Sequence, residues 1–248
     1  MRYKLGKLPA RKNSISFRLK DYLSIPSLPI PPVSVNHQDT ISNWQMLGND
    51  QYGDCVWAGA GHETMLWTKN GGKLAPINEK DVLAAYTAVT GFNPNDPSTD
   101  QGTDMQLAAS YRQKTGIVDN SGKYHRVVAY LSLTPGNYEE LKHSIYLFEN
   151  AGIGWQLPES AQDQTQEGKA WSIVSNSPIE GGHYTPAMGY DAKYIYIITW
   201  GQVQKVEWAF FDKYCDEALV YFSDDMLNNG KSLEGFNVTQ LQEDLKAL

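Results

Sequence analysis

The sequence is poor in cysteine and has no long apolar segment. Only two of its 248 residues are cysteine, too few for the disulfide framework of a small secreted domain. Apolar runs such as Ile-Tyr-Ile-Ile at 195–198 fall far short of the roughly 20 residues of a membrane-spanning helix. No apolar stretch follows the basic N-terminus, so we expect neither a signal peptide nor a membrane partner.

Extremes of composition are absent as well. Apolar residues make up 41% of the chain and charged residues 20%, which excludes a wholly disordered chain, a collagen and a coiled coil. No sequence period repeats, and no tract has low complexity. A chain of this length and composition is expected to form one globular domain.

Acidic residues are missing from the first 20 positions, although the whole chain carries a net charge of -7. That stretch holds seven basic residues: Arg2, Lys4, Lys7, Arg11, Lys12, Arg18 and Lys20. The rest of the chain is therefore strongly acidic and repels phosphate, so we expect no nucleic-acid partner. The basic segment could contact phosphate, an acidic partner such as another subunit, or the chain's own acidic body, and we favour the last two.

Three stretches differ in pattern. Residues 1–40 form an N-terminal arm, basic at first and then rich in proline, with four prolines between positions 24 and 35. This density favours extended backbone, and the alternating apolar residues beside the prolines predict a strap laid along an apolar groove. Residues 41–225 form the domain, and 226–248 form a C-terminal tail or short helix.

Helical periodicity is confined to the first part of the domain, and strand patterns dominate the second. Apolar spacing predicts helices at 54–68, 78–89, 104–115 and 137–151. Aromatic and β-branched residues predict strands at 127–133, 153–157, 183–190, 194–199, 204–209 and 217–222. Helices followed by an antiparallel sheet indicate the α+β class.

Two residues carry the most suggestive chemistry. Cys55 opens the first helix of the domain, where the helix dipole lowers the pKa of a thiol. His183 stands at the start of a predicted strand, where an imidazole could take the thiol proton. Thr199 and Trp200 end the next strand, so a polar group there could orient the imidazole while the indole shields that contact from water.

Carboxamides lie just upstream of the cysteine, at Asn49 and Gln51. A carboxamide N–H can stabilise an oxyanion together with the backbone N–H of the nucleophile. A thiol, an imidazole and these donors are the parts that acyl transfer through a cysteine requires.

The order of these motifs resembles that of the papain-like cysteine peptidases, which show a glutamine, a cysteine at the head of a long helix, a histidine on a strand and then Asn-Ser-Trp-Gly. Residues 49–55 (Asn-Asp-Gln-Tyr-Gly-Asp-Cys) resemble the segment that contains the glutamine and the cysteine. Residues 182–190 (Gly-His-Tyr-Thr-Pro-Ala-Met-Gly-Tyr) resemble the histidine strand, and residues 199–201 (Thr-Trp-Gly) resemble the Asn-Ser-Trp-Gly block. Segments 102–108 and 140–153 match in order, so the resemblance covers residues 41–222. Without the disulfides of secreted papains, the chain is most similar to short papain-like proteins of bacteriophages and bacteria.

The resemblance implies an α+β fold in which a helical subdomain, led by the Cys-bearing helix, packs on an antiparallel β-sheet or barrel subdomain. The roles that it implies are oxyanion donor for Asn49 or Gln51, nucleophile for Cys55, base for His183, orientation of the base for Thr199 and support for Trp200. It implies a peptide or protein substrate and no cofactor or metal.

The sequence departs from the family pattern at three points. The family glutamine lies six residues before the cysteine; Asn49 has this spacing and Gln51 has the residue type, and we favour Asn49. The family asparagine is absent, because its place falls on Thr199 by spacing from His183, or on Ile198 by counting back from the tryptophan. The secretory and propeptide architecture is also absent, and residues 1–40 are short for an inhibitory prodomain, although they could lie along the cleft.

Two classes of function follow. The first is a thiol hydrolase that cleaves peptide, isopeptide or amide bonds through Cys55 and His183. The second is a weak or inactive papain-like scaffold, for example in a phage particle, in which both residues are merely packed in the core and the arm binds other subunits. The expected location is accordingly cytoplasmic or virion-associated.

Three further residues are weaker candidates for the site. His62 lies two helical turns after the cysteine, too far to share a metal with it. Asp191 is an alternative acid partner for the strand histidine, and Cys215 is expected to be an inert packed thiol.

Overall fold

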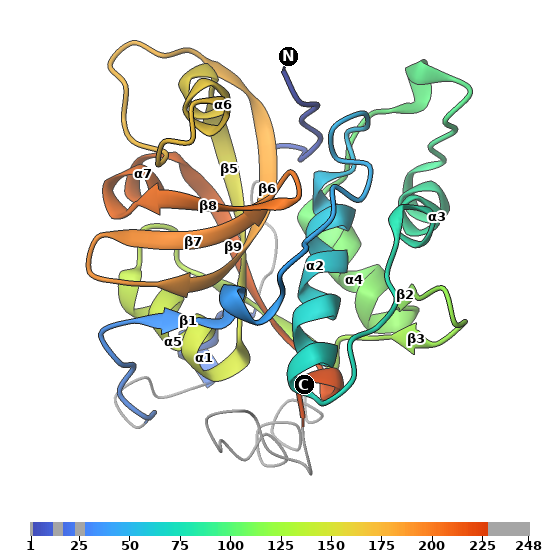
Figure 1. Ribbon diagram of the computed structural model, residues 1–248, viewed down its shortest axis with the longest axis horizontal. Coiled ribbons are helices and arrows are strands. Elements are labelled where there is room, and N and C mark those ends of the chain that lie inside the picture. Colours follow the sequence, from blue (N-terminus) through green and yellow to red (C-terminus); the bar gives the residue numbers. More distant parts are fainter. Residues whose placement is uncertain (1, 12–16, 23–27, 228–248) are drawn as a thin grey trace.

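The computed structural model describes residues 2–11, 17–22 and 28–227. A large sheet with some of the helices around it lies on the left in Figure 1, further helices lie on the right, and helix α2 (Cys55–Asn70) runs between the two parts. This arrangement confirms the predicted α+β class and the Cys-bearing helix at its centre. Residues 228–248, most of the predicted C-terminal tail or short helix, lie outside the described residues.

The sheet is antiparallel throughout, with the strand order β4-β9-β5-β6-β7-β8 and a short β1 beside β6. Its strands are β1 (Val35–Asn36), β4 (Ala129–Leu133), β5 (Ala151–Pro158), β6 (Ile179–Tyr190), β7 (Tyr194–Thr199), β8 (Gln202–Glu207) and β9 (Cys215–Phe222). Strand β6 lies at the centre of this order and packs against α2, so residues of β6 and α2 meet at the middle of the fold.

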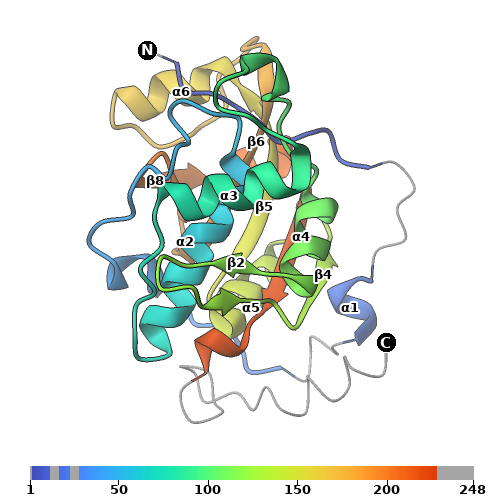
Figure 2. The ribbon, with the colours of Figure 1, turned by 90° about the vertical axis from the view of Figure 1, so that its right-hand side faces the viewer.

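Helices α3 (Glu79–Thr90) and α4 (Met105–Lys114) cover α2 on the side away from the sheet, next to the hairpin of β2 (Ile117–Val118) and β3 (Tyr124–His125) (Figures 1 and 2). The helix predicted over 78–89 is α3, and its N-terminus is fixed by a capping box between Asn78 and Asp81. The remaining helices are α1 (Leu19–Tyr22), α5 (Tyr138–Phe148), α6 (Glu159–Gln166) and α7 (Trp208–Tyr214), with 3-10 turns η2 (His37–Thr40), η3 (Pro97–Thr99) and η4 (Asp224–Met226).

Two predicted elements end too late. The helix predicted to reach residue 151 stops at Phe148, because Glu149 adopts a left-handed φ of 68° and Ala151 already pairs with Ala187 in the sheet. The strand predicted over 204–209 ends at Glu207, where α7 begins. In both cases tertiary packing overrides the local pattern. Helix α6 was not predicted, because few of its buried residues are apolar.

The proline-rich part of the arm differs from the predicted strap. Val35 is buried and pairs with Tyr190 of β6, but Ile30 and Val33 are 90% and 89% exposed. The prediction that the alternating apolar residues lie in a groove is therefore wrong for these two. No helix in the described ranges is long and apolar enough to cross a membrane.

Candidate active site

Cys55 is the first residue of α2, and it is only 1% exposed. Backbone hydrogen bonds from Tyr184 and Gly6 and the nearby charge of Lys7 favour its thiolate, but burial dominates and raises the pKa of the thiol to about 12. The sequence predicted a lowered pKa from the helix dipole. That prediction is wrong for this state, because desolvation of the anion outweighs the dipole.

His183 lies on β6 and is completely buried. Its Nε2 atom lies 2.7 Å from Thr199 Oγ1, whereas Nδ1 has no hydrogen-bond partner within the described part of the chain. Burial lowers the pKa of the imidazole to about 3. The ring is therefore neutral near pH 7, with one nitrogen held and the other free to accept a proton.

Trp200 covers the histidine from the turn between β7 and β8. Trp200 and Gly201 have φ values of 48° and 70°, as a two-residue turn between paired strands requires. A left-handed conformation is unusual for a tryptophan, and here it stacks the indole on His183 with ring centroids 4.7 Å apart. The indole therefore lies against the imidazole that Thr199 contacts.

Tyr184, next to the histidine, ties β6 to α2. A Cβ atom at Gly59 of α2 or at Gly152 of β5 would collide with its ring, so these glycines make room for it. Its hydroxyl donates to Glu63 Oε1 at 2.6 Å. Tyr184 was not predicted as a site residue from the sequence, and its backbone also hydrogen-bonds the Cys55 thiol.

The carboxylate that accepts from the Tyr184 hydroxyl also belongs to a buried ion pair. Glu63 Oε2 lies 2.6 Å from Arg112 Nη1, and both side chains are almost fully buried. Arg112 also stacks over Tyr221, 4.2 Å from the ring centroid. The pair joins α2 to α4 directly below the strand that carries His183.

The two predicted oxyanion donors differ in position. Asn49 is buried and its Nδ2 atom donates to Asp54 Oδ1 at 3.3 Å, next to Cys55 in sequence. Gln51 is exposed. Burial raises the pKa of Asp54, the acid that Asn49 contacts, well above its usual value.

The remaining candidates are engaged elsewhere. His62 Nε2 lies 3.0 Å from the carbonyl of Gln45. The carboxylate of Asp191 accepts from the Tyr196 hydroxyl at 2.7 Å. Cys215 Sγ donates to the carbonyl of Glu217 at 3.5 Å. No group of three or more residues suited to hold a metal ion occurs among the residues that the structure describes.

The N-terminal arm passes directly over the cysteine. Lys7 N–H donates to the carbonyl of Gly182 at 3.0 Å, and Thr103 N–H donates to the carbonyl of Gly6 at 2.7 Å. Gly6 lies so close to Gly53 that a Cβ atom would collide with the Gly53 carbonyl. The blue N-terminal segment enters between the sheet and α2 (Figure 1), and it excludes water from the thiol.

Charged side chains fasten the arm to the acidic body. Among the described residues, four basic side chains do so: Arg2 pairs with Asp163 at 3.1 Å, Lys4 with Asp100 at 2.8 Å, Lys7 with Asp216 at 2.8 Å and Arg11 with Asp104 at 2.7 Å. Tyr3 adds a stacked contact with Trp200, with centroids 4.8 Å apart. The excess of basic residues in the first 20 was the sequence signal for this docking onto the chain's own body.

Comparison with known proteins gives relatives at the level of structure only. No family model and no curated protein sequence matches the chain. Among solved structures, it is similar to xylellain, a cysteine protease from Xylella fastidiosa, with a TM-score of 0.68 and 12% identity over 90% of this chain and 98% of that one.

Two proenzymes are also similar. Procathepsin B S9 from Trypanosoma congolense has a TM-score of 0.64 and 12% identity, over 89% of this chain and 86% of that one. Digestive procathepsin L 3 from the larval midgut of Tenebrio molitor has a TM-score of 0.62 and 15% identity, over 86% and 76%. These likenesses confirm the papain-like fold.

Proposed function

We propose that this chain is a thiol hydrolase of peptide, isopeptide or amide bonds, in which Cys55 is the nucleophile and His183 its base. The observation that carries the proposal is the histidine itself: Nε2 is held by Thr199, the ring is stacked under Trp200, and Nδ1 is free. Xylellain, one of the similar structures, is a cysteine protease, which supports the same chemistry.

The reaction uses the groups as follows. His183 Nδ1 takes the thiol proton, and Cys55 Sγ attacks the carbonyl carbon of the substrate. The oxyanion accepts from the Cys55 backbone N–H, at the open first turn of α2, and from Asn49 Nδ2 once this leaves Asp54. The proton then passes from His183 to the departing amine, and water hydrolyses the thioester with the same histidine as base.

The described state is a closed one. The arm contacts the thiol, the imidazole is also buried, and burial moves both pKa values in the directions that disfavour a thiolate–imidazolium pair. A substrate reaches Cys55 only after residues 5–8 move away. The arm thus acts as the chain's own inhibitor.

Because the arm closes the site, a test of this function needs a variant in which the arm is displaced. A chain that carries Gly6→Val and Lys7→Ala, called the released variant below, cannot seat the arm, because a side chain at position 6 collides with Gly53. We expect this variant to hydrolyse members of a mixed fluorogenic peptide library slowly, and Cys55→Ala in the same background to abolish cleavage. Cleavage that survives Cys55→Ala, or no cleavage by the folded released variant, refutes the proposal.

Substitutions at Thr199 should change kcat/KM according to how well the new side chain orients His183. Its hydroxyl can either accept from Nε2–H or donate to Nε2, so it does not fix the tautomer that leaves Nδ1 basic, whereas an asparagine carbonyl only accepts. In the released variant, Thr199→Asn should keep or raise kcat/KM. The isosteric Thr199→Val should lower it by about tenfold or more, since the ring loses its partner. Equal rates for all three would show that Thr199 does not orient the base.

An inactive scaffold is the second candidate. The threonine in place of the family asparagine and the fully closed cleft favour it. Its association with a phage particle has no support among the structural neighbours, and the ion pairs of Arg2, Lys4, Lys7 and Arg11 lie within this chain rather than on another subunit.

A further inference from the structure

The side chain of Lys7 is completely buried, which is unusual for lysine. Its ammonium group lies 2.8 Å from Asp216 and 3.3 Å from Glu217, at the start of β9, and donates to the carbonyl of Leu8 at 3.1 Å. A buried ammonium is tolerated only when it is paired and hydrogen-bonded. The body of the protein therefore provides a binding site for a cation.

The body is shaped for this side chain. A Cβ atom at Gly154 of β5 would collide with Lys7 Cε and approach Met105 Sδ and Asp216 Oδ1 to 2.8 and 3.0 Å. Gly154 therefore leaves the space that the lysine stem fills. We call the site formed by Met105, Gly154, Asp216 and Glu217 the cation pocket.

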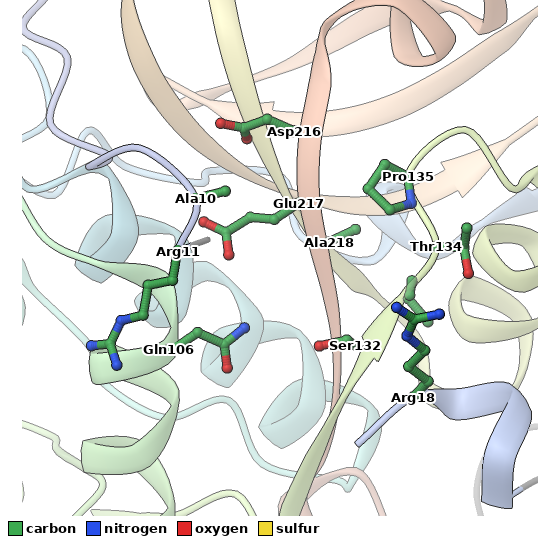
Figure 3. Close-up of a pocket in the computed structure, with 11 residues that line it drawn as sticks. Ala10, Arg11, Arg18, Gln106, Ser132, Thr134, Pro135, Asp216, Glu217 and Ala218 are labelled. Atoms are coloured by element: carbon green, nitrogen blue, oxygen red, sulfur yellow. The ribbon is translucent and has the colours of Figure 1, made fainter. Parts of the chain in front are cut away.

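The carboxylates belong to the sheet, not to the arm. In Figure 3 they extend from β9 toward the side where arm residues Ala10 and Arg11 lie, and an open cavity of about 190 Å³ continues beside them. The charged groups that act on them are Lys7 and Arg11 from the arm and Asp104 from the start of α4. Lys7 and Arg11 leave with the displaced segment, and the carboxylates of Asp104, Asp216 and Glu217 then outnumber Arg18, which also lines the cavity.

The pocket adjoins the reacting thiol. Lys7 N–H pairs with Gly182, the residue before His183, and the preceding residue, Gly6, hydrogen-bonds Cys55. When the arm leaves, the carbonyl of Gly182 and both backbone groups of Thr103 lose their partners. An extended peptide satisfies these groups and places one of its side chains where Lys7 lay.

We propose that, in the open enzyme, Asp216 and Glu217 bind a lysine or arginine side chain of the substrate and so select peptides with a basic residue near the cleaved bond. This inference rests on the proposed function. The arm then holds the cleft closed by presenting the same cation that a substrate presents.

Matched peptides test the selection. The released variant, in which Lys7→Ala leaves the pocket empty, is given fluorogenic peptides that carry lysine, arginine, norleucine or glutamate at each position in turn. We expect lysine or arginine at one position to raise kcat/KM at least tenfold over norleucine, which has a similar length and no charge. Asp216→Asn/Glu217→Gln should remove most of this ratio, whereas Glu139→Gln/Glu167→Gln, which removes two exposed charges, should leave it.

A binding measurement that needs no turnover accompanies the assay. A synthetic peptide of residues 2–11 should protect Cys55 of the released variant from alkylation, and the same peptide with norleucine at position 7 should protect at least tenfold less well. Cleavage without any preference for a basic side chain overturns the cation pocket as a substrate site and leaves the hydrolase intact. No cleavage of any peptide, with lysine-dependent protection preserved, overturns the hydrolase and reduces the pocket to an anchor of the arm.

Discussion

Substituting Gly6 by valine and Lys7 by alanine should raise the rate at which iodoacetamide alkylates Cys55 by about a hundredfold at pH 7.5. In the closed chain, burial raises the thiol pKa to about 12. Exposure alone returns the thiol to an ordinary pKa of about 8.5, before any further lowering by the imidazolium of His183, and this increases the thiolate fraction by roughly three orders of magnitude. A less basic thiolate is also a weaker nucleophile, which reduces the alkylation rate by between one and two orders of magnitude. The net increase in rate is therefore about a hundredfold.

Peptide mapping by mass spectrometry assigns the alkylated residue, because Cys215 is the other thiol in the chain. Lys4→Ala is the matched control: it also removes a basic arm residue, but its pair with Asp100 is half exposed on the lysine side, so we expect less than about a threefold change. A wild-type chain in which Cys55 already reacts as fast as a small free thiol would show that the arm does not close the site.

The largest effect on stability is expected at the buried ion pair. Glu63→Ala leaves the Arg112 guanidinium without its carboxylate in a fully buried position, which costs about 3–5 kcal/mol. The tyrosine hydroxyl on the same carboxylate loses its acceptor as well. Urea unfolding followed by far-UV circular dichroism measures the free energy of unfolding.

Two controls separate the ion pair from the packing around it. Tyr184→Phe keeps the ring between Gly59 and Gly152 and removes only one hydrogen bond, so it should cost about 1 kcal/mol. Glu63→Leu/Arg112→Met removes both charges together and should recover most of the loss, since no unpaired charge remains. A Glu63→Ala chain destabilised by less than about 1 kcal/mol contradicts the account of this network.

Much of the fold was predictable because it depends on local patterns. The cap at Asn78, the helix that starts at Cys55 and the strand over 194–199 follow from side-chain types and spacing within one element. The order of the cysteine, histidine and Thr-Trp-Gly motifs predicted the papain-like fold. His183 and Thr199 meet because they lie on adjacent strands, β6 and β7, which the strand prediction already implied.

The closure of the site was not predictable in the same way. Lys7 is buried by partners more than 200 positions away in the sequence, and nothing in its own neighbourhood distinguishes it from a surface lysine. The effect of the helix dipole on Cys55 depends only on neighbouring residues in the sequence. The pKa of the thiol, however, is set by residues of the arm and of β6 that exclude water. The sequence indicates the chemistry of the site, and the tertiary contacts determine whether that chemistry is available.

Once the arm is displaced, we expect Cys55 and His183 to form a thiolate–imidazolium pair. The most direct measurement is the rate of Cys55 alkylation between pH 4 and 9 in the released variant, with and without His183→Ala. We expect the chain with His183 to keep a substantial rate below pH 6, because the imidazolium lowers the thiol pKa, while the His183→Ala chain loses about tenfold per pH unit below about pH 8. Identical profiles with a single inflection near pH 8.5 in both chains would contradict the claim.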